Sequence, residues 1–152
     1  MVEAVQSAGF HLRPEADFDD AFHHVMTSAI EPKIGKERPC VIEKWPRQMA
    51  GLSKICADNP LLADRFEIYF MGLEIANAFA ELTDPVEQRR RFEQDLAHKL
   101  ALGKDLLPIN DKFLKDLAFM PPSVGIAVGF DRLLLSISGL NQIENIHPLT
   151  WF

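Results

Sequence analysis

The chain has 152 residues, of which 47% are hydrophobic and 25% are charged, and its formal net charge is −6. This composition predicts one globular domain or a large piece of one, and it excludes an intrinsically disordered chain. The acidic balance also disfavours a broad nucleic-acid-binding surface, because such surfaces are usually basic.

The two cysteines, Cys40 and Cys56, lack the spacing of a zinc site or of a disulfide framework. Cys40 lies in an apolar, strand-like run and is expected to be a core thiol, which favours a reducing, cytoplasmic location. The sequence has no run of 18 apolar residues and no basic N-terminal region followed by an apolar one. Neither a membrane span nor a signal peptide is therefore predicted.

The first third of the chain predicts a helix, a loop and a strand. Residues 1–14 predict a short element with a turn, and residues 16–30 place apolar side chains at helical spacing. Residues 31–39 are rich in Pro, Gly and charge and predict a loop, whereas residues 39–46 predict a short strand between two prolines. A loop with a short helix is expected for residues 47–63.

Residues 65–79 predict a β-hairpin, because two aromatic or β-branched runs flank Met71 and Gly72. With those two residues as the turn, Tyr69 is expected opposite Glu74, and Glu67 opposite Ala76. Glu67 and Glu74 would then be diagonal neighbours on one face. Two carboxylates on one face are expected to face a divalent cation or a cationic ligand.

The remaining chain predicts helices over 85–102 and 110–119, a strand over 124–130, a helix over 131–139, and a short element with a final strand over 140–152. Asp84 and Asn110 are the expected caps of the first two helices. The basic run at 89–91 is interpreted as a solvated helix face of mixed charge. Hairpins interspersed with helices predict an α+β fold, an antiparallel β-sheet flanked by helices, in a single domain over 1–152.

One motif that predicts chemistry is GIAVGFDR, residues 125–132. Gly125 and Gly129 would let another group approach the strand backbone closely. Arg132 follows in the first turn of the next helix, and its fork of donors suits phosphate oxygens. Tight helix–sheet packing with a surface ion pair at Arg132 explains the same spacing equally well.

The segment 72–84, GLEIANAFAELTD, is a second candidate for a binding site. It embeds three polar side chains, Glu74, Asn77 and Glu81, among apolar ones. Such groups are costly to bury without partners, and a bound cation or ammonium group would satisfy them. A polar network that joins two parts of the fold is the alternative.

Together these segments resemble the lysine branch of the class II aminoacyl-tRNA synthetases, and GIAVGFDR is similar to class II motif 3. Four further segments occur in the family order over roughly residues 16–140: EPKIGKERP, DRFEIYF, ELTDPVEQRRRFEQD and LPINDKFLKDL. The resemblance implies part of a class II catalytic-domain fold, and an ATP-dependent lysine-activating ligase. For the full-length family it also implies a homodimer.

Within that branch, Ala127 and Ala76 resemble the elongation factor P lysine ligase family more than lysyl-tRNA synthetase, which typically has Gly at both places. A methyl group at Ala127 would change the space around the α-carbon end of the substrate, and so the preference between α-lysine and β-lysine. Elongation factor P is the implied acceptor, with tRNA-Lys as the alternative.

The resemblance also implies roles for individual residues. Glu67 and Glu74 would hold Mg2+ and ATP, with Gly125, Gly129 and the catalytic Arg132 around the nucleotide. Lysine would be held by residues on both sides of the pocket: Asn77 at its carboxylate, Glu81 at its side-chain ammonium, and Ala127 in the wall. Arg132 and Mg2+ would stabilise charge on the phosphates during adenylate formation.

The sequence also departs from the family. Motifs 1 and 2 have no counterpart, so the chain matches only the C-terminal half of the catalytic domain. Ala78 and Ala80 replace a Gly and a polar residue that the families usually have. We therefore expect this chain alone to be inactive without the missing half. It would be a fragment, the product of a split or truncated gene, or a catalytically inactive paralogue that acts as a binding module.

Overall fold

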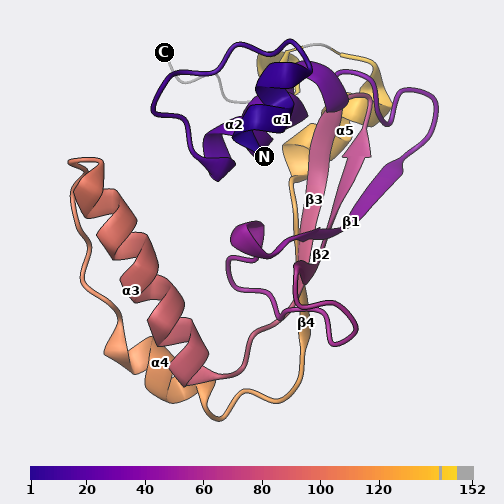
Figure 1. Cartoon of the computed structure of the whole chain (residues 1–152). Helices are drawn as coiled ribbons and strands as arrows, with labels where there is room; N and C mark the ends of the chain where they lie inside the picture. The colour runs from indigo at the N-terminus through magenta and orange to yellow at the C-terminus, as the bar shows by residue number, and fades with distance from the viewer. Residues whose placement is uncertain (141, 147–152) are drawn as a thin grey trace.

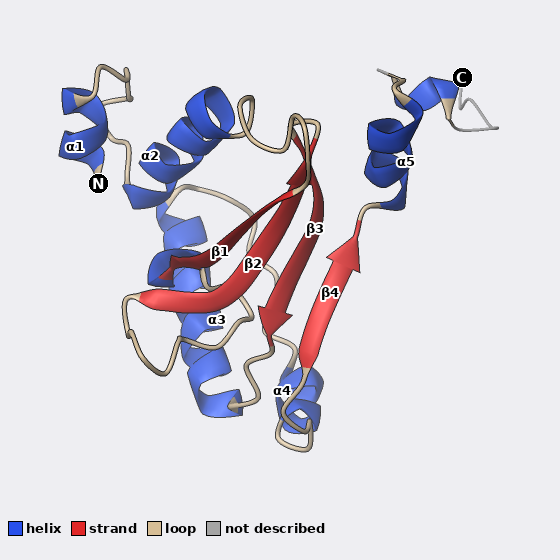
Figure 2. Ribbon diagram, turned by 90° about the vertical axis from the view of Figure 1, so that its right-hand side faces the viewer, coloured by secondary structure: helices blue, strands red, loops and turns tan. Residues whose placement is uncertain are grey.

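The computed structural model describes residues 1–140 and 142–146 of the chain (Figure 1). Four strands form one antiparallel sheet in the order β1-β2-β3-β4, with helices around it (Figure 2). This confirms the predicted α+β class. The strands are β1 (Cys40–Pro46), β2 (Leu62–Phe70), β3 (Leu73–Ala80) and β4 (Val124–Val128). The helices are α1 (Val2–Ser7), α2 (Phe18–Val25), α3 (Pro85–Ala101), α4 (Asp111–Leu117) and α5 (Phe130–Ser138).

The β2–β3 hairpin turns at the two predicted residues. Met71 and Gly72 have φ of 54° and 78°, which is the left-handed backbone that a two-residue hairpin turn requires. Tyr69 pairs with Glu74, as expected, but Glu67 pairs with Asn77 and not with Ala76. The predicted register was wrong there because an extra residue on β3 makes a bulge beyond the Tyr69–Glu74 pair. The bulge brings Asn77 onto the face of the sheet that carries Glu67.

The helices begin at the side-chain caps that the sequence predicts. Asp84 accepts from the backbone of Val86 at 2.8 Å at the start of α3, and Asn110 accepts from Phe113 at 3.0 Å at the start of α4. The predicted helix over 16–30 is α2 followed by a π-helical turn, Met26–Ile30. Strand β4 leads directly into α5, as predicted.

The hydrophobic core lies between α2 and the β1–β2 half of the sheet. Met26, Trp45, Ala63 and Tyr69 are buried there, and the ring of Phe22 contacts Trp45 edge-on at 5.3 Å between centroids. Cys40 was expected in the core, but it lies half-buried in the edge strand β1, and Cys56 is the buried thiol. Both cysteines are free.

Helices α3 and α4 and the described part of the tail are among the parts of the chain that lie outside this core. Helices α3 and α4 pack on each other and stand to one side of the sheet (Figure 1). The short element predicted in the tail is a 3-10 turn, Ile143–Asn145, while the predicted final strand lies outside the described residues. None of the helices over the described residues has an apolar stretch of the length that a membrane span requires.

Candidate functional site

A shallow cavity of about 350 Å³ opens beside strands β3 and β4. The three residues expected to hold lysine, Asn77, Glu81 and Ala127, line it together with Gly125. Its remaining lining residues are Leu52, Phe79 and Ile126. The antiparallel pairing explains why these residues meet, because β3 and β4 bring together segments that are about fifty residues apart in the chain.

The cavity has two different ends. Asn77 pairs across the strands with Ala127, and two residues further along Phe79 pairs with Gly125. The carboxylate of Glu81 lies against Gly125, so that a methyl group at Gly125 would stand only 2.1 Å from Glu81 Oε1. An amide therefore lies at one end and a carboxylate at the other, separated by about 7 Å of strand.

Glu81 is held in place by its backbone, whereas its carboxylate has no polar partner among the described residues. The backbone N–H of Glu81 donates to the carbonyl of Ser123 at 2.9 Å, and the backbone of Glu81 forms a β-bridge with Ser53. No described residue donates a hydrogen bond to the carboxylate or forms an ion pair with it. A half-buried carboxylate without a partner suits a cationic ligand, because a bound ammonium group would supply the missing donors.

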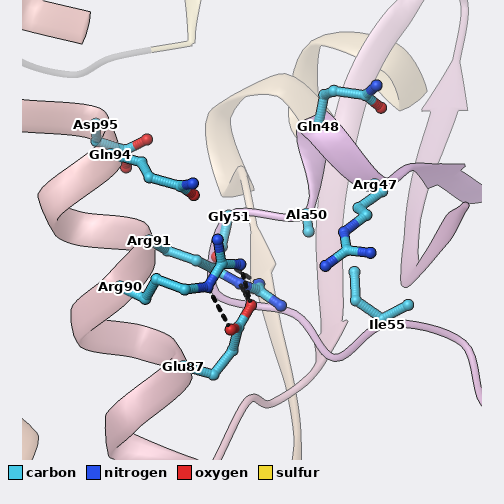
Figure 3. Close-up of a pocket in the computed structure, with 10 residues that line it drawn as sticks. All are labelled: Arg47, Gln48, Ala50, Gly51, Ile55, Glu87, Arg90, Arg91, Gln94 and Asp95. Carbon is cyan, nitrogen blue, oxygen red and sulfur yellow. Dashed lines mark hydrogen bonds and ion pairs between the residues drawn. The ribbon is translucent and has the colours of Figure 1, made fainter. Parts of the chain in front are cut away.

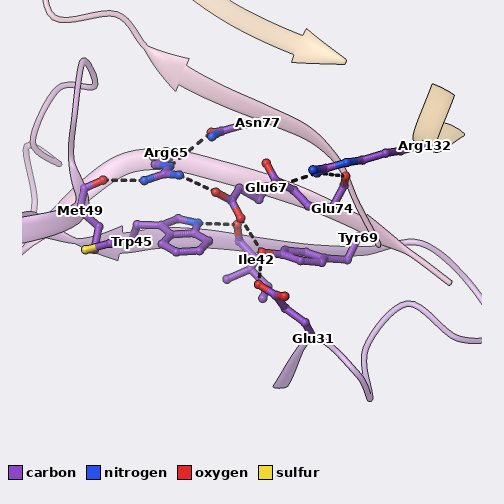
Figure 4. A network of polar contacts seen from close by, with 10 residues as sticks. All are labelled: Glu31, Ile42, Trp45, Met49, Arg65, Glu67, Tyr69, Glu74, Asn77 and Arg132. Carbon is purple, nitrogen blue, oxygen red and sulfur yellow. Dashed lines mark hydrogen bonds and ion pairs between the residues drawn. The ribbon is translucent and has the colours of Figure 1, made fainter. Parts of the chain in front are cut away.

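Beside the cavity, a polar row crosses the face of the sheet (Figure 4). Glu67 is only 4% exposed, and both of its oxygens are engaged. Arg65 pairs with one oxygen, and the Tyr69 hydroxyl donates to the other at 2.6 Å. Burial and the hydrogen bond to Glu67 raise the pKa of Tyr69, so the hydroxyl stays protonated and keeps donating.

Arg65 is the residue that the sequence analysis missed. Besides pairing with Glu67, it donates to the carbonyl of Met49 at 2.7 Å and to Asn77 Oδ1 at 3.3 Å. Its guanidinium lies 4.6 Å from the ring centroid of Trp45. The signal was present in the sequence, since an arginine two residues before a buried glutamate in a strand must share its face.

Arg132 and Glu74, the expected phosphate and metal contacts, pair with each other (Figure 4). Arg132 Nη1 donates to the Glu74 carbonyl at 2.9 Å and lies 3.4 Å from its carboxylate. Burial, followed by repulsion from Glu67, raises the pKa of Glu74 above its ordinary value, and Arg132 offsets part of this. A cation placed between the two carboxylates would relieve that repulsion.

The two motif 3 glycines have different surroundings. Gly129 precedes α5, and a methyl group there would meet Arg132 Cδ at 3.5 Å, which is an ordinary contact. Gly125 lies in the cavity with Glu81 instead, where a methyl group cannot be placed unless Glu81 moves. Contact of both glycines with ATP stays a prediction.

A second, charged cleft of about 360 Å³ lies between α3 and residues 47–55 (Figure 3). Its arginines are largely committed to partners. Arg90 and Arg91 both donate to Glu87, while Arg91 also donates to the carbonyl of Ser53 at 2.8 Å. This confirms the mixed charge of the helix face, but the predicted solvation was wrong for Arg91, whose side chain is only 12% exposed because it binds the loop that forms the bridge with Glu81.

Comparisons with known proteins identify the family of the chain. Residues 11–150 match the family described as tRNA synthetases class II (D, K and N). The chain is 40% identical over 133 residues to the "Elongation factor P--(R)-beta-lysine ligase" of Proteus mirabilis, covering 87% of this chain and 41% of that protein. The protein of that name from Erwinia tasmaniensis is 40% identical over 144 residues (94% and 44%). The one from Edwardsiella ictaluri is 43% identical over 133 residues (87% and 41%). The chain thus spans about two fifths of the length of these relatives.

Proposed function

The chain belongs to the class II tRNA synthetases (D, K and N), and from that premise we propose that it carries the lysine pocket of an ATP-dependent ligase that modifies elongation factor P. The observation that carries the proposal is the cavity beside β3 and β4, with the Asn77 amide at one end and the Glu81 carboxylate, which no described residue pairs with, at the other. These ends complement the carboxylate and the side-chain ammonium of a lysine.

In this proposal, Glu81 binds the side-chain ammonium and Asn77 donates to the carboxylate. The methyl group of Ala127 stands opposite Asn77, at the carboxylate end, where α-lysine and β-lysine differ. The names of the relatives favour (R)-β-lysine. A carboxylate oxygen of the amino acid would attack the α-phosphorus of ATP, the bond to the β-phosphate would break, and pyrophosphate would leave with an aminoacyl adenylate as the other product.

Arg132 is the proposed catalytic residue, because it pairs with Glu74, the proposed magnesium ligand, and is more than half exposed. When ATP is bound, the N–H donors of Arg132 would leave Glu74 and bind phosphate oxygens. They would then stabilise the charge that develops on those oxygens. Gly125 and Gly129 would leave room near the nucleotide, although Gly125 also makes room for Glu81.

The residues present fit a magnesium ion shared with ATP. No described group of three or more His, Cys, Asp or Glu residues could hold a metal ion, but magnesium is commonly held by one or two carboxylates together with substrate phosphates. Glu74 is the better ligand, since both oxygens of Glu67 already have partners. The ion, when bound, would neutralise phosphate charge.

We further propose that this chain is the C-terminal half of the catalytic domain, with motif 3 and without motifs 1 and 2. Strand β4 is at the edge of the described sheet, and Val124, Ile126 and Val128 are 74%, 55% and 53% exposed. An apolar edge strand of this kind favours covering by further polypeptide. The homodimer and the transfer to elongation factor P belong to the longer protein.

The test is a thermal-shift titration with a non-hydrolysable lysyl-adenylate analogue. A ligand that binds only the folded chain raises the unfolding midpoint, and we expect a rise that Glu81→Gln abolishes. Glu37→Gln, at an exposed carboxylate away from the cavity, is the matched control and should keep the rise. No rise in the parent chain would refute a pocket formed by this chain.

A second measurement separates an enzyme half from a binding module. The chain is mixed with the N-terminal segment of the Proteus mirabilis relative that it does not match, and lysine-dependent exchange of pyrophosphate into ATP is followed. Exchange that Arg132→Ala abolishes supports the ligase. Analogue binding without any exchange supports a module that binds the ligand without catalysis.

A further inference from the structure

Arg65 connects the polar row of β2 to the cavity. Its side chain is 15% exposed and is held from several directions. It donates to the Met49 carbonyl at 2.7 Å, pairs with Glu67, and lies 5.4 Å from the ring centroid of Phe79, a cavity residue. These contacts leave the guanidinium little freedom, so the direction of its Nε–H donor is fixed. That donor, Nε–H, points at Asn77 Oδ1 at 3.3 Å.

The chemistry of the guanidinium determines how Asn77 is oriented. Arginine has five N–H donors and no acceptor, so the group that Asn77 turns toward Arg65 must be its oxygen. The two N–H donors of the amide then point away from Arg65. No described residue accepts a hydrogen bond from them, and Asn77 lines the cavity. At this end, the cavity therefore has hydrogen-bond donors from Asn77 and no acceptor from it.

We propose that Arg65 is the positioning residue for the carboxylate end of the cavity. By binding Asn77 Oδ1, it makes Asn77 present donors only, and so selects a ligand with a carboxylate over one with a carboxamide. The naming of the ligand as an amino acid rests on the proposed function, whereas the orientation of Asn77 does not. Arg65 need not touch the ligand for this role.

The test compares L-lysine with L-lysinamide by NMR titration of the 15N-labelled chain. Both ligands carry the ammonium that Glu81 would bind, so the ratio of their affinities reports on the Asn77 end alone. A charged acceptor forms the stronger hydrogen bond, so we expect the parent to prefer lysine by about five- to tenfold.

Two variants and a control follow from the geometry. In Arg65→Lys a single ammonium replaces the three nitrogens that hold Met49, Glu67 and Asn77. It should stay with the buried Glu67 carboxylate, so Asn77 loses the donor that orients it and the affinity ratio should come close to one. Arg38→Lys makes the same replacement at an exposed position and should leave the ratio unchanged. If Arg65 were only a structural support, Arg65→Lys would weaken both ligands equally and keep the ratio, which would overturn the proposal.

Asn77→Asp keeps the test decisive if Arg65→Lys does not fold. The carboxylate that this substitution introduces would pair with Arg65 and present acceptors to the cavity, so the preference should reverse toward lysinamide. An unchanged preference for lysine would overturn the proposal.

The orientation of Asn77 is also measured without any ligand. In the parent, its side-chain N–H protons should show NOE contacts to the Ala127 methyl group, which stands opposite on β4. Contacts to Arg65 Hε in place of these would overturn the inference. If the parent binds neither ligand but shows the expected contacts, the proposed function fails for this chain and the role of Arg65 stands.

Discussion

Two neighbouring regions on one face of the sheet differ in whether their carboxylates have polar partners. In the row on β2, the buried Glu67 has Arg65 on one oxygen and Tyr69 on the other. In the cavity beside β3 and β4, no described residue pairs with the Glu81 carboxylate. A buried polar group costs free energy unless it is paired. The row therefore stabilises the fold, and the cavity is where a ligand would supply the missing partner.

The largest expected effect on stability comes from removing the ion pair between Arg65 and Glu67 in the polar row. Arg65→Met leaves the Glu67 carboxylate buried without its cation, and we expect the free energy of unfolding to fall by about 3–5 kcal/mol. Urea denaturation followed by circular dichroism measures this. Because the cost comes from the uncompensated charge, the double variant Arg65→Met/Glu67→Leu should recover a large part of the loss.

A surface ion pair is the control for this experiment. Lys112 pairs with Asp116 along α4, with 83% and 64% of the two side chains exposed. Lys112→Met should change stability by less than about 0.5 kcal/mol, as for other exposed helix pairs. A double variant no more stable than Arg65→Met alone would mean that lost packing around Arg65, and not the charge of Glu67, destabilises the chain.

In the cavity, one added methyl group should change ligand affinity more than it changes the free energy of unfolding. In Gly125→Ala the new methyl group would lie 2.1 Å from Glu81 Oε1, and the tip of a glutamate can move aside cheaply. We expect the unfolding free energy to change by less than about 1 kcal/mol. Affinity for lysine should fall by about tenfold or more, which calorimetric titration measures.

Gly129→Ala is the matched variant in the same motif. Its methyl group would meet Arg132 Cδ at 3.5 Å, an ordinary contact, and it lies outside the cavity lining. The affinity for lysine itself should therefore stay within about twofold of the parent. Equal losses of lysine affinity in both variants would contradict the assignment of Gly125 to the Glu81 end.

Local patterns were enough to predict most of the fold. The caps at Asp84 and Asn110, the turn at Met71–Gly72 and the order of strands and helices each depend on residues close together in the chain, so the sequence contains their determinants. The bulge on β3 could not be predicted this way. Register depends on how two strands pair, and a single extra residue moved the partner of Glu67 from Ala76 to Asn77.

The candidate site was predicted less completely than the fold. The resemblance identified Asn77, Glu81 and Ala127, and the structure places all three in one cavity. Arg65 was missed because its contacts with Met49 and Asn77 come from other parts of the chain. The space that Gly125 leaves for Glu81 was also missed, since it depends on the pairing of β3 with β4.

The smallest expected effect is a difference in pH dependence between a carboxylate of the open site and one that is fully paired. Burial and then Glu67 raise the pKa of Glu74, so the folded state loses stability as pH rises from about 4.5 through the folded pKa. Hydrogen bonds from Arg90 and Arg91 lower the pKa of Glu87 to about 2, and its contribution is lost as pH falls from 4.5 toward 2.

The two carboxylates should therefore respond to neutralisation with opposite signs. At pH 7, Glu74→Gln should stabilise the chain and Glu87→Gln should destabilise it, each by less than about 1 kcal/mol because both side chains are partly exposed. Both differences should shrink on acidification, for Glu74→Gln as pH falls through its raised folded pKa toward about 4.5, and for Glu87→Gln as pH falls from about 4.5 toward 2. Urea denaturation across this range measures them. Shifts of the same sign would mean that Arg132 already offsets the burial of Glu74, and Glu74 would then belong with the paired carboxylates rather than with the open site.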